Sequence, residues 1–264
     1  MTKTILLTGA TDGIGFETAK LLAREGHTLL LHGRNVQKLA TAREAISAVP
    51  GAGAIETFAA DLSDLAQVEG LAREIAAAHT GLDVLINNAG VLKSGQPITK
   101  DGRDIRFVVN TLAPYVLTKR LLPRLSSQAR VINVSSAAQA PVDLQALTSG
   151  MPIDDMAAYG QSKLAITMWT RALAREHKDG PIFVAVNPGS LLASKMVKEG
   201  FGVAGSDLSI GADILVRAAL ASEFAGANGK YFDNDSGRFA NPHPDATDDK
   251  KCVQLTQQLD ALVS

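Results

Sequence analysis

The sequence predicts a single-domain α/β protein built on a doubly wound parallel sheet. Short β-rich runs alternate with longer helical patterns along all 264 residues. This alternation indicates parallel strands with helices on both faces of the sheet. No linker or low-complexity segment interrupts the chain, so residues 1–264 are expected to form one domain.

Strands are expected at the β-rich runs near residues 4–8, 28–32, 54–59, 83–87, 130–135, 182–187 and 229–232. Helical patterns lie between them, near residues 14–25, 36–48, 64–79, 101–125, 157–178 and 208–221, with another near 247–262. Pro242–Pro244 is interpreted as a surface connection before the last helix. Right-handed crossovers are expected, and such sheets bind ligands beyond the carboxyl ends of their strands.

Composition excludes several classes of function. The net charge of -1 and the pI near 6.5 give no electrostatic reason to expect nucleic acid or an anionic membrane as partner. The N-terminus lacks the apolar core of a signal peptide, and no run approaches the roughly 18 apolar residues of a membrane span. We therefore expect a cytoplasmic protein. Cys252 is the only cysteine, so neither an internal disulfide nor a cysteine-based metal site is expected.

A glycine-rich turn follows the first strand. Thr8–Gly15 comes after the apolar run Thr4–Leu7 and before a helical pattern, which is the context of a Rossmann-type dinucleotide fingerprint. Glycines there permit the tight turn and let a pyrophosphate approach the backbone at the helix N-terminus. The alternative is a turn without a ligand.

Tyr159 and Lys163 lie one helical turn apart and face the same way. An ammonium about 4 Å from a phenolate contributes roughly 4 kcal/mol at an effective dielectric of about 20, so the phenol pKa could fall from near 10 toward neutrality. The pair would then act as an acid-base catalyst. The alternative is a partly exposed helix tyrosine beside an unrelated lysine.

Further segments complete an ordered set: Asp61–Leu62, Asn87–Gly90, Asn110, Val134–Ser136 and Asn187–Gly189. Together with the glycine-rich turn and the Tyr-x-x-x-Lys pair, this set resembles the short-chain dehydrogenase/reductase family over essentially the whole chain. The resemblance implies cofactor-binding roles for Gly9, Thr11, Asp12, Gly13, Ile14, Gly15, Arg34, Asn35, Asp61, Leu62, Asn88, Ala89, Gly90, Tyr159, Lys163, Pro188, Gly189, Leu191 and Ser194. Ser194 is assigned because Ala193 occupies the usual threonine position.

The end of the second strand favours NADP(H) over NAD(H). No acidic residue is present there to accept bonds from a ribose 2'-hydroxyl, whereas Arg34 could pair with a 2'-phosphate. The alternative is that Arg34 caps or covers a helix start. Asp12 departs from NADP-preferring members that carry a basic residue before the second glycine. Asp61, which resembles an adenine-bracketing residue, could instead be a helix N-cap, as Ser63 could.

The resemblance also implies a catalytic tetrad of Asn110, Ser136, Tyr159 and Lys163. Tyr159 would exchange a proton with the substrate oxygen, and Ser136 would position that oxygen. Lys163 would lower the tyrosine pKa and hold the ribose, while Asn110 would bind a relay water. Alternatively, the serine forms a turn and the asparagine bonds backbone. Ser135 competes with its neighbour for the catalytic role.

The motif Tyr-x-x-Ser-Lys-Leu-Ala and the long spacing from Ser136 to Tyr159 resemble the retinol dehydrogenase-like branch. The insert over residues 137–158 could roof an apolar substrate pocket or cover the protein's own core, through Val142, Leu144, Leu147, Met151 and Met156. The segment 195–206 could be a mobile lid or a plain surface loop.

We therefore expect an NADP(H)-dependent oxidoreductase acting on a carbonyl or secondary alcohol of a small, fairly apolar molecule. The alternative is a catalytically silent cofactor-binding regulator or scaffold. The family resemblance also implies a homodimer or larger homo-oligomer through the helix of Lys163, whose apolar side includes Leu164, Met168 and Ala172. That stripe could instead pack against the chain's own sheet. No metal site is expected.

Overall fold

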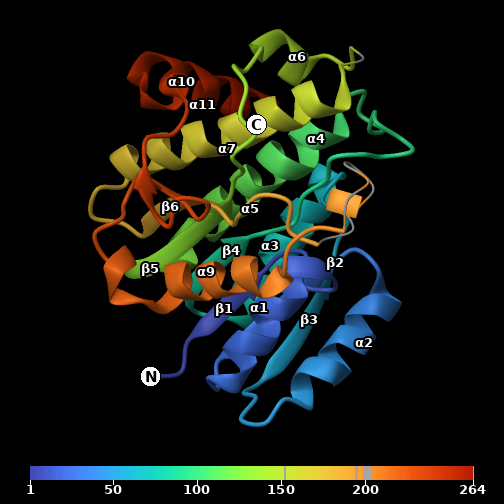
Figure 1. Ribbon diagram of the computed structural model, residues 1–264, viewed down its shortest axis with the longest axis vertical. Coiled ribbons are helices and arrows are strands. Elements are labelled where there is room, and N and C mark those ends of the chain that lie inside the picture. Colours follow the sequence, from blue (N-terminus) through green and yellow to red (C-terminus); the bar gives the residue numbers. More distant parts are fainter. Residues whose placement is uncertain (152, 194–195, 199–201, 203, 264) are drawn as a thin grey trace.

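A computed structural model describes residues 1–151, 153–193, 196–198, 202 and 204–263 (Figure 1). The strands are β1 (Thr4–Leu7), β2 (Thr28–Gly33), β3 (Ile55–Ala59), β4 (Leu82–Asn87), β5 (Leu125–Val134), β6 (Ile182–Asn187), β7 (Lys230–Asp233) and β8 (Arg238–Ala240). Within the described residues they form one eight-stranded sheet in the order β3-β2-β1-β4-β5-β6-β7-β8. Only β8 in this sheet runs antiparallel to its neighbour. The predicted doubly wound sheet is confirmed.

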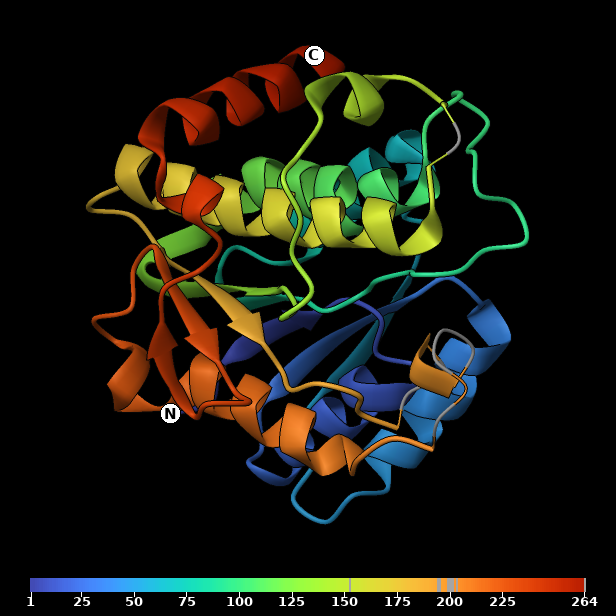
Figure 2. The same ribbon diagram turned by 45° about the horizontal axis from the view of Figure 1, so that its top comes forward.

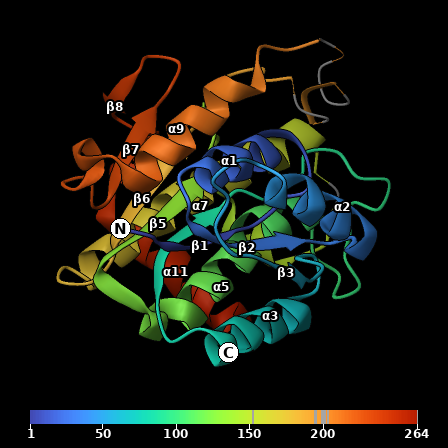
Figure 3. The same ribbon diagram turned by 90° about the horizontal axis from the view of Figure 1, so that it is seen from below.

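The longer helices are α1 (Gly13–Arg24), α2 (Val36–Ser47), α3 (Leu65–Ala78), α5 (Ala113–Leu121), α7 (Asp155–Glu176), α9 (Leu208–Leu220) and α11 (Asp249–Val263). Shorter helical elements are α4 (Ile105–Phe107), a π-helical turn η1 (Val108–Leu112), η2 (Leu122–Arg124), α6 (Leu144–Thr148), η3 (Ser222–Phe224) and α10 (Pro244–Thr247). Helices α1, α2 and α9 cover one face of the sheet, and α3, α5 and α7 cover the other (Figure 3).

The central strand β1 shows why the sheet needs helices on both sides. Successive side chains of a strand point to opposite faces, and here Leu6 belongs to the core on the α3, α5 and α7 side whereas Ile5 and Leu7 belong to the core on the other side. All three side chains are fully buried. A strand that is apolar in both directions is typical of a parallel sheet covered on both faces.

The predicted helix over residues 101–125 is wrong at both ends. Gly102 adopts a positive φ of 73° inside a turn closed by the Gly102 N–H and the Thr99 carbonyl, at 3.0 Å. The helix begins only at Ile105, where the Asp104 carboxylate accepts the Arg106 N–H. At the other end β5 begins at Leu125, earlier than residue 130, because Leu125 pairs with Leu82 across a register irregularity.

Several short elements in the second half of the chain were not predicted. Residues 144–148 of the insert form α6, and residues 238–240 form the antiparallel strand β8. The expected last helix is two helices, because Pro244 begins α10 with His243 as its N-cap and α11 starts afresh at Asp249. Pro242–Pro244 is therefore more than a surface connection.

Helix α11 forms an outer layer over α7, with α10 and α6 beside it (Figure 2). Leu255 and Leu259 of α11 are fully buried and belong to the same apolar cluster as Leu164 and Met168 of α7. Ala172 packs against this cluster. The apolar stripe of α7 is thus covered by the chain itself. The prediction that this stripe packs against a second copy of the chain is therefore wrong. A homo-oligomer would have to use another surface.

In the part of the chain that the structure describes, no helix combines the length and the apolar character that crossing a membrane requires.

We expect the α11 layer to contribute strongly to stability. Replacing Leu255 by Ala should lower the free energy of unfolding by about 2 to 5 kcal/mol, because the substitution opens a cavity in a fully buried cluster. Val253→Ala is the matched control, since Val253 lies on the same helix and is 49% exposed; its effect should stay within about 0.5 kcal/mol. Urea denaturation measures both, and equal effects would contradict the covering role of α11.

Candidate active site

The glycine-rich turn is held against the end of β4 by the Asn88 amide. Its Nδ2 donates to the carbonyl oxygens of Thr8 and Gly9, at 2.9 and 3.2 Å. Gly9 has a positive φ of 67°, and a Cβ on Gly15 would lie 2.2 Å from the Gly9 oxygen, so both positions require glycine. This packing directs the N-terminus of α1, where Asp12 accepts the Gly13 N–H, toward the carboxyl edge of the sheet.

A cleft of about 970 Å³ runs along this edge. It brings together almost all of the predicted site residues, which lie far apart in the sequence: Gly9, Thr11, Asp12, Gly13, Ile14, Gly15, Arg34, Asn35, Asp61, Leu62, Asn88, Ala89, Gly90, Ser136, Tyr159, Lys163, Pro188, Gly189 and Leu191. Two predicted residues are not among its described walls. Asn110 is buried behind the cleft, and Ser194 lies outside the residues that the structure describes.

One end of the cleft carries positive charge. Arg34 is exposed there, and none of the described residues hydrogen-bonds or pairs with its guanidinium. The helix start beside it is capped by Asn35, whose Oδ1 accepts the Lys38 N–H at 2.9 Å, so the capping alternative for Arg34 is wrong. Lys38 also lines the cleft. Lys38 was not predicted as a site residue, although its position in the first turn of a predicted helix beside Arg34 could have indicated it.

The buried His32 joins two walls of this end. Its Nδ1 accepts the Gly9 N–H at 3.4 Å, and its Nε2 lies 3.1 Å from the Ala60 carbonyl oxygen. Burial lowers the pKa of His32 to about 4, so the ring is neutral at pH 7. A neutral ring can accept at one nitrogen and donate at the other. His32 thereby links the glycine-rich turn to the end of β3. No sequence motif predicted this role.

Asp61 and Leu62 line the cleft after β3. The Asp61 carboxylate accepts the Ser63 N–H and hydroxyl at 2.9 and 2.8 Å, which is a local turn. The N-cap of α3 is Asp64, which accepts the Ala66 and Gln67 N–H groups. The alternative that Asp61 or Ser63 caps this helix is therefore wrong.

Tyr159, Ser136 and Lys163 meet at the other end of the cleft. Helix α7 presents Tyr159 and Lys163 on one side, with the Lys163 Nζ 5.6 Å from the centre of the tyrosine ring. The Ser136 side chain lies close enough to the Tyr159 hydroxyl to lower its pKa. Ser135 is turned away from this contact, because its hydroxyl bonds the Lys163 carbonyl and the Thr167 hydroxyl. Ser136 is thus the serine that faces the phenol.

The protonation states differ from the prediction. Burial raises the pKa of Tyr159, and the Ser136 side chain only partly opposes this rise. Burial also lowers the pKa of Lys163 to about 8. The Lys163 Nζ donates to the Val134 carbonyl oxygen at 2.7 Å and not to the phenol oxygen. The expected near-neutral phenol is therefore wrong for this structure, because its raised pKa leaves Tyr159 protonated at pH 7.

Asn110 holds the wall of the cleft from behind. Its Oδ1 accepts the Val91 N–H at 2.8 Å, while its Nδ2 donates to the Val91 carbonyl and the Ser162 hydroxyl at 2.9 and 3.0 Å. The side chain therefore bonds the backbone, as one interpretation of the sequence supposed, and it also bonds the Ser162 hydroxyl. The relay water assigned to Asn110 stays a prediction.

Tyr231 and Gln139 fix the backbone of Ser136. The Tyr231 hydroxyl and the Gln139 amide donate to the Ser136 carbonyl oxygen at 3.1 and 2.9 Å. Tyr231 comes from β7, almost a hundred residues away in sequence. Its role could not be read from a motif because only the strand order brings β7 beside β6 and the end of β5.

The insert over residues 137–158 covers the protein's own core more than it roofs a pocket. Leu147 is fully buried, and Val142 and Leu144 pack against the core cluster of α7. Met151 and Met156 are 54% and 39% exposed, and neither lines the cleft. From the predicted lid, Met196 and Val197 line the cleft, whereas Lys195, residues 199–201 and Val203 lie outside the described residues.

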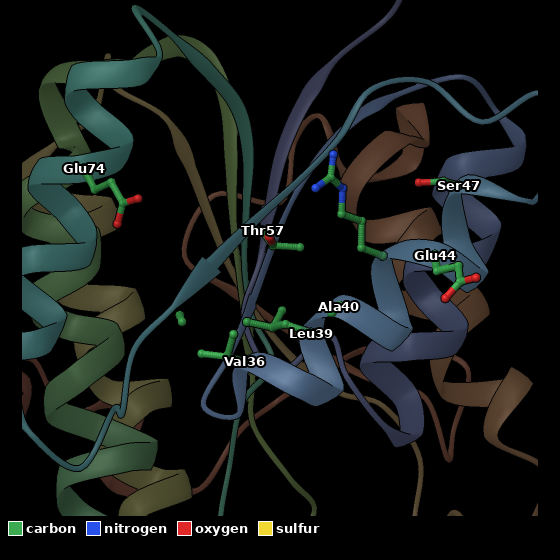
Figure 4. Close-up of a pocket in the computed structure, with 9 residues that line it drawn as sticks. Val36, Leu39, Ala40, Glu44, Ser47, Thr57 and Glu74 are labelled. Carbon is green, nitrogen blue, oxygen red and sulfur yellow. The ribbon is translucent and has the colours of Figure 1, made fainter.

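A second groove, of about 580 Å³, lies between α2 and the edge strand β3 (Figure 4). Val36, Leu39 and Thr57 face it in the close-up, with Glu44 and Ser47 farther along α2. None of the predicted site residues that the structure describes lines this groove. The chemistry therefore belongs to the larger cleft.

Comparisons with known proteins agree with this geometry. The family model for short chain dehydrogenases matches residues 3–202. Retinol dehydrogenase 13 of Homo sapiens is 32% identical over 283 residues, covering 99% of this chain and 84% of the relative. A solved structure of an uncharacterized protein from Mycobacterium paratuberculosis has a TM-score of 0.82 at 30% identity and covers 99% of this chain and 93% of that one.

A short chain dehydrogenase from Burkholderia cenocepacia, solved in complex with NADP, has a TM-score of 0.71 at 26% identity and covers 89% of this chain and 97% of that one. The predicted resemblance to retinol dehydrogenase-like proteins is confirmed by the similarity to retinol dehydrogenase 13. Because the family model spans most of the chain and the relatives share the whole fold, the chain belongs to the short-chain dehydrogenase family.

Proposed function

We propose that the protein, as one catalytic domain over residues 1–264, is an NADP(H)-dependent oxidoreductase that acts on a carbonyl or secondary alcohol of a small, fairly apolar molecule. The observation that carries this proposal is that a single cleft has a cofactor-binding candidate at one end and catalytic candidates at the other. Arg34 stands without a described partner at one end, and Tyr159 with Ser136 and Lys163 stands at the other.

The residues of the cleft fit NADP(H). The N-terminus of α1 offers N–H groups to a pyrophosphate. Arg34 and Lys38 supply the cationic groups that a 2'-phosphate would need. Lys163 spends one N–H on the Val134 carbonyl, so further donors are available to a ribose. The NADP complex of the Burkholderia cenocepacia relative supports the same cofactor.

In this mechanism the bound cofactor supplies or accepts the hydride. Tyr159 donates its phenolic proton to the substrate oxygen during reduction, and its raised pKa keeps that proton in place beforehand. Ser136 hydrogen-bonds the same oxygen and fixes its distance from the phenol. The Lys163 ammonium stabilises the phenolate that donation leaves, because it lies above the same ring. In oxidation the phenolate takes the proton back.

An apolar substrate is supported by the apolar part of the cleft wall. Leu92, Ile105, Val109, Met196 and Val197 line the cleft. Such a surface favours a hydrophobic body and offers few hydrogen bonds. A panel of aldehydes, ketones and quinones with NADPH, followed by loss of nicotinamide absorbance, tests the proposal. Turnover of none of them by a folded, NADPH-binding protein would instead support the cofactor-binding regulator.

The cofactor preference should depend on Arg34. We expect NADPH to bind at least about tenfold more tightly than NADH, roughly 1.4 kcal/mol, and Arg34→Ala to remove most of this preference. Arg43→Ala is the matched control, because Arg43 lies on α2 but lines the other groove. Fluorescence titration with both nucleotides measures the ratio. Equal affinities for NADPH and NADH in the unmodified protein would contradict the assignment of NADP(H) as the cofactor.

Tyr159→Phe should abolish turnover and leave NADPH binding nearly intact, because the substitution removes the proton-donating hydroxyl and keeps the ring that lines the cleft. General acid-base groups contribute about 10² to 10⁴ in rate. Tyr231→Phe is an informative control, since it removes a hydroxyl that donates to the Ser136 carbonyl and interacts with Gln139; its effect on the rate should be much smaller. A loss below about tenfold for Tyr159→Phe, roughly 1.4 kcal/mol, would show that this tyrosine is not the proton donor.

The rate of carbonyl reduction should fall with rising pH. Reduction needs a protonated Tyr159 and a charged Lys163, and the lowered pKa of Lys163, about 8, makes the lysine the first group to lose its proton. We therefore expect kcat/KM for reduction to be flat near pH 7 and to decline through about pH 8. Steady-state rates at saturating NADPH measure this profile. A reduction rate that climbs steadily across this range would contradict the assigned protonation states.

A further inference from the structure

The loop that follows β6 is fastened to the turn between β7 and β8. The Asp235 carboxylate of that turn accepts two hydrogen bonds from the loop, the Ser190 N–H at 2.8 Å and the Ser190 hydroxyl at 2.5 Å. It accepts a third from the amide of Asn187, the last residue of β6, at 2.9 Å. Asp235 is exposed, and it does not line the cleft. Its hydrogen bonds therefore act on the loop and not on a ligand.

Neighbouring residues of the turn complete the attachment. Asn234 donates through Nδ2 to the Pro188 carbonyl at 2.9 Å and more weakly to the Ile210 carbonyl at 3.3 Å. Asp233 accepts a second hydrogen bond from the Asn187 amide at 2.8 Å. Asn187 at the end of β6 and the loop residues Pro188 and Ser190 are thus each hydrogen-bonded to this turn. The strands concerned, β6 and β7, lie side by side in the sheet (Figure 2).

The attached loop has an unusual backbone. Leu191 has a φ of 52°, a left-handed conformation that side chains other than glycine rarely adopt, and Gly189 has a φ of 121°. Strained backbone persists only where the surroundings determine it, and it gathers at ligand sites. Gly189, Ser190 and Leu191 all line the cleft. The turn therefore holds a strained segment in the wall of the candidate active site.

The loop stands at the end of the cleft that contains Tyr159. Strand β6 is the direct neighbour of β5, and Ser135, beside Ser136, donates its N–H to the Val186 carbonyl of β6. Arg34 follows β2, which is separated from β6 by β1, β4 and β5. A dinucleotide with its 2'-phosphate at Arg34 would place its nicotinamide half against Pro188–Leu191.

We propose that Asp235 is a positioning residue that holds Pro188–Leu191 in the shape that binds the nicotinamide half of NADP(H). This inference rests on the proposed function. Asp235 touches neither cofactor nor substrate; it acts through Ser190 and Asn187. Its removal should weaken the nicotinamide half of the site and leave the adenosine half, at Arg34, as it was.

Two ligands separate these halves in a binding experiment on the full chain. NADPH requires both, whereas 2',5'-ADP carries only the adenosine half with its 2'-phosphate. For Asp235→Ala we expect NADPH affinity to fall by about tenfold, the scale of losing charge-assisted hydrogen bonds, while 2',5'-ADP affinity changes by less than about twofold. Ser236→Ala is the matched control in the same turn, because the Ser236 hydroxyl bonds only Asp233; it should change neither affinity.

A second variant tests whether Asp235 acts through Ser190. Ser190→Ala should also weaken NADPH selectively, and the double variant should lose less than the two single losses combined, because both act on one contact. Unchanged NADPH affinity in Asp235→Ala, or equal losses of NADPH and 2',5'-ADP, would overturn the inference. If the unmodified protein binds neither ligand, the proposed function itself fails. Failure of the Asp235 inference would instead appear only in the comparison of the variant with the unmodified protein.

Discussion

The burial of Lys163 against the backbone of β5 is the constraint on which the candidate active site depends. Its side chain is 3% exposed, and its ammonium donates to the Val134 carbonyl at 2.7 Å. Burying an ammonium is costly unless its donors are satisfied, so the helix that carries it must be held firmly. Polar contacts do this: the Ser135 hydroxyl bonds the Lys163 carbonyl, and the Thr111 hydroxyl bonds the Ser162 carbonyl. The position of Tyr159 follows from this fixation, since it shares the same helix.

A buried polar layer behind the cleft extends this fixation to the strands. The Asn87 amide donates to Asn133 at 2.8 Å and to Thr118 at 3.1 Å, and the Asn133 amide donates to Thr170 at 2.8 Å. These groups join β4, β5, α5 and α7 at one depth. Buried polar networks of this kind favour one packing arrangement of a core, although the Oδ1 of Asn87 has no hydrogen-bond partner among the described residues. The outer layer of α11 acts differently, through apolar burial, and it closes the face of α7 that a second copy would otherwise need.

Local patterns in the sequence predicted what local chemistry determines. Gly9 and Gly15 were recognisable because a tight turn admits no side chain there, and Tyr159 with Lys163 because one helical turn separates them. Features that depend on distant contacts were missed. Asp235 reaches Ser190 only because β7 pairs with β6, and Asn110 faces Val91 because η1 packs behind the cleft. The tyrosine pKa was misjudged for the same reason, because burial raises it and the spacing of Tyr159 and Lys163 in the sequence does not reveal how deeply the phenol is buried.

The central claim is that this cleft transfers hydride from the nicotinamide directly to a carbonyl carbon while Tyr159 supplies the proton. Reduction of an active ketone with NADPH deuterated at the transferable C4 position, followed by mass spectrometry and NMR of the alcohol, tests it most directly. The account predicts one deuterium on the carbinol carbon of the product and a hydroxyl hydrogen that comes from solvent. A product with no deuterium at that carbon would contradict it.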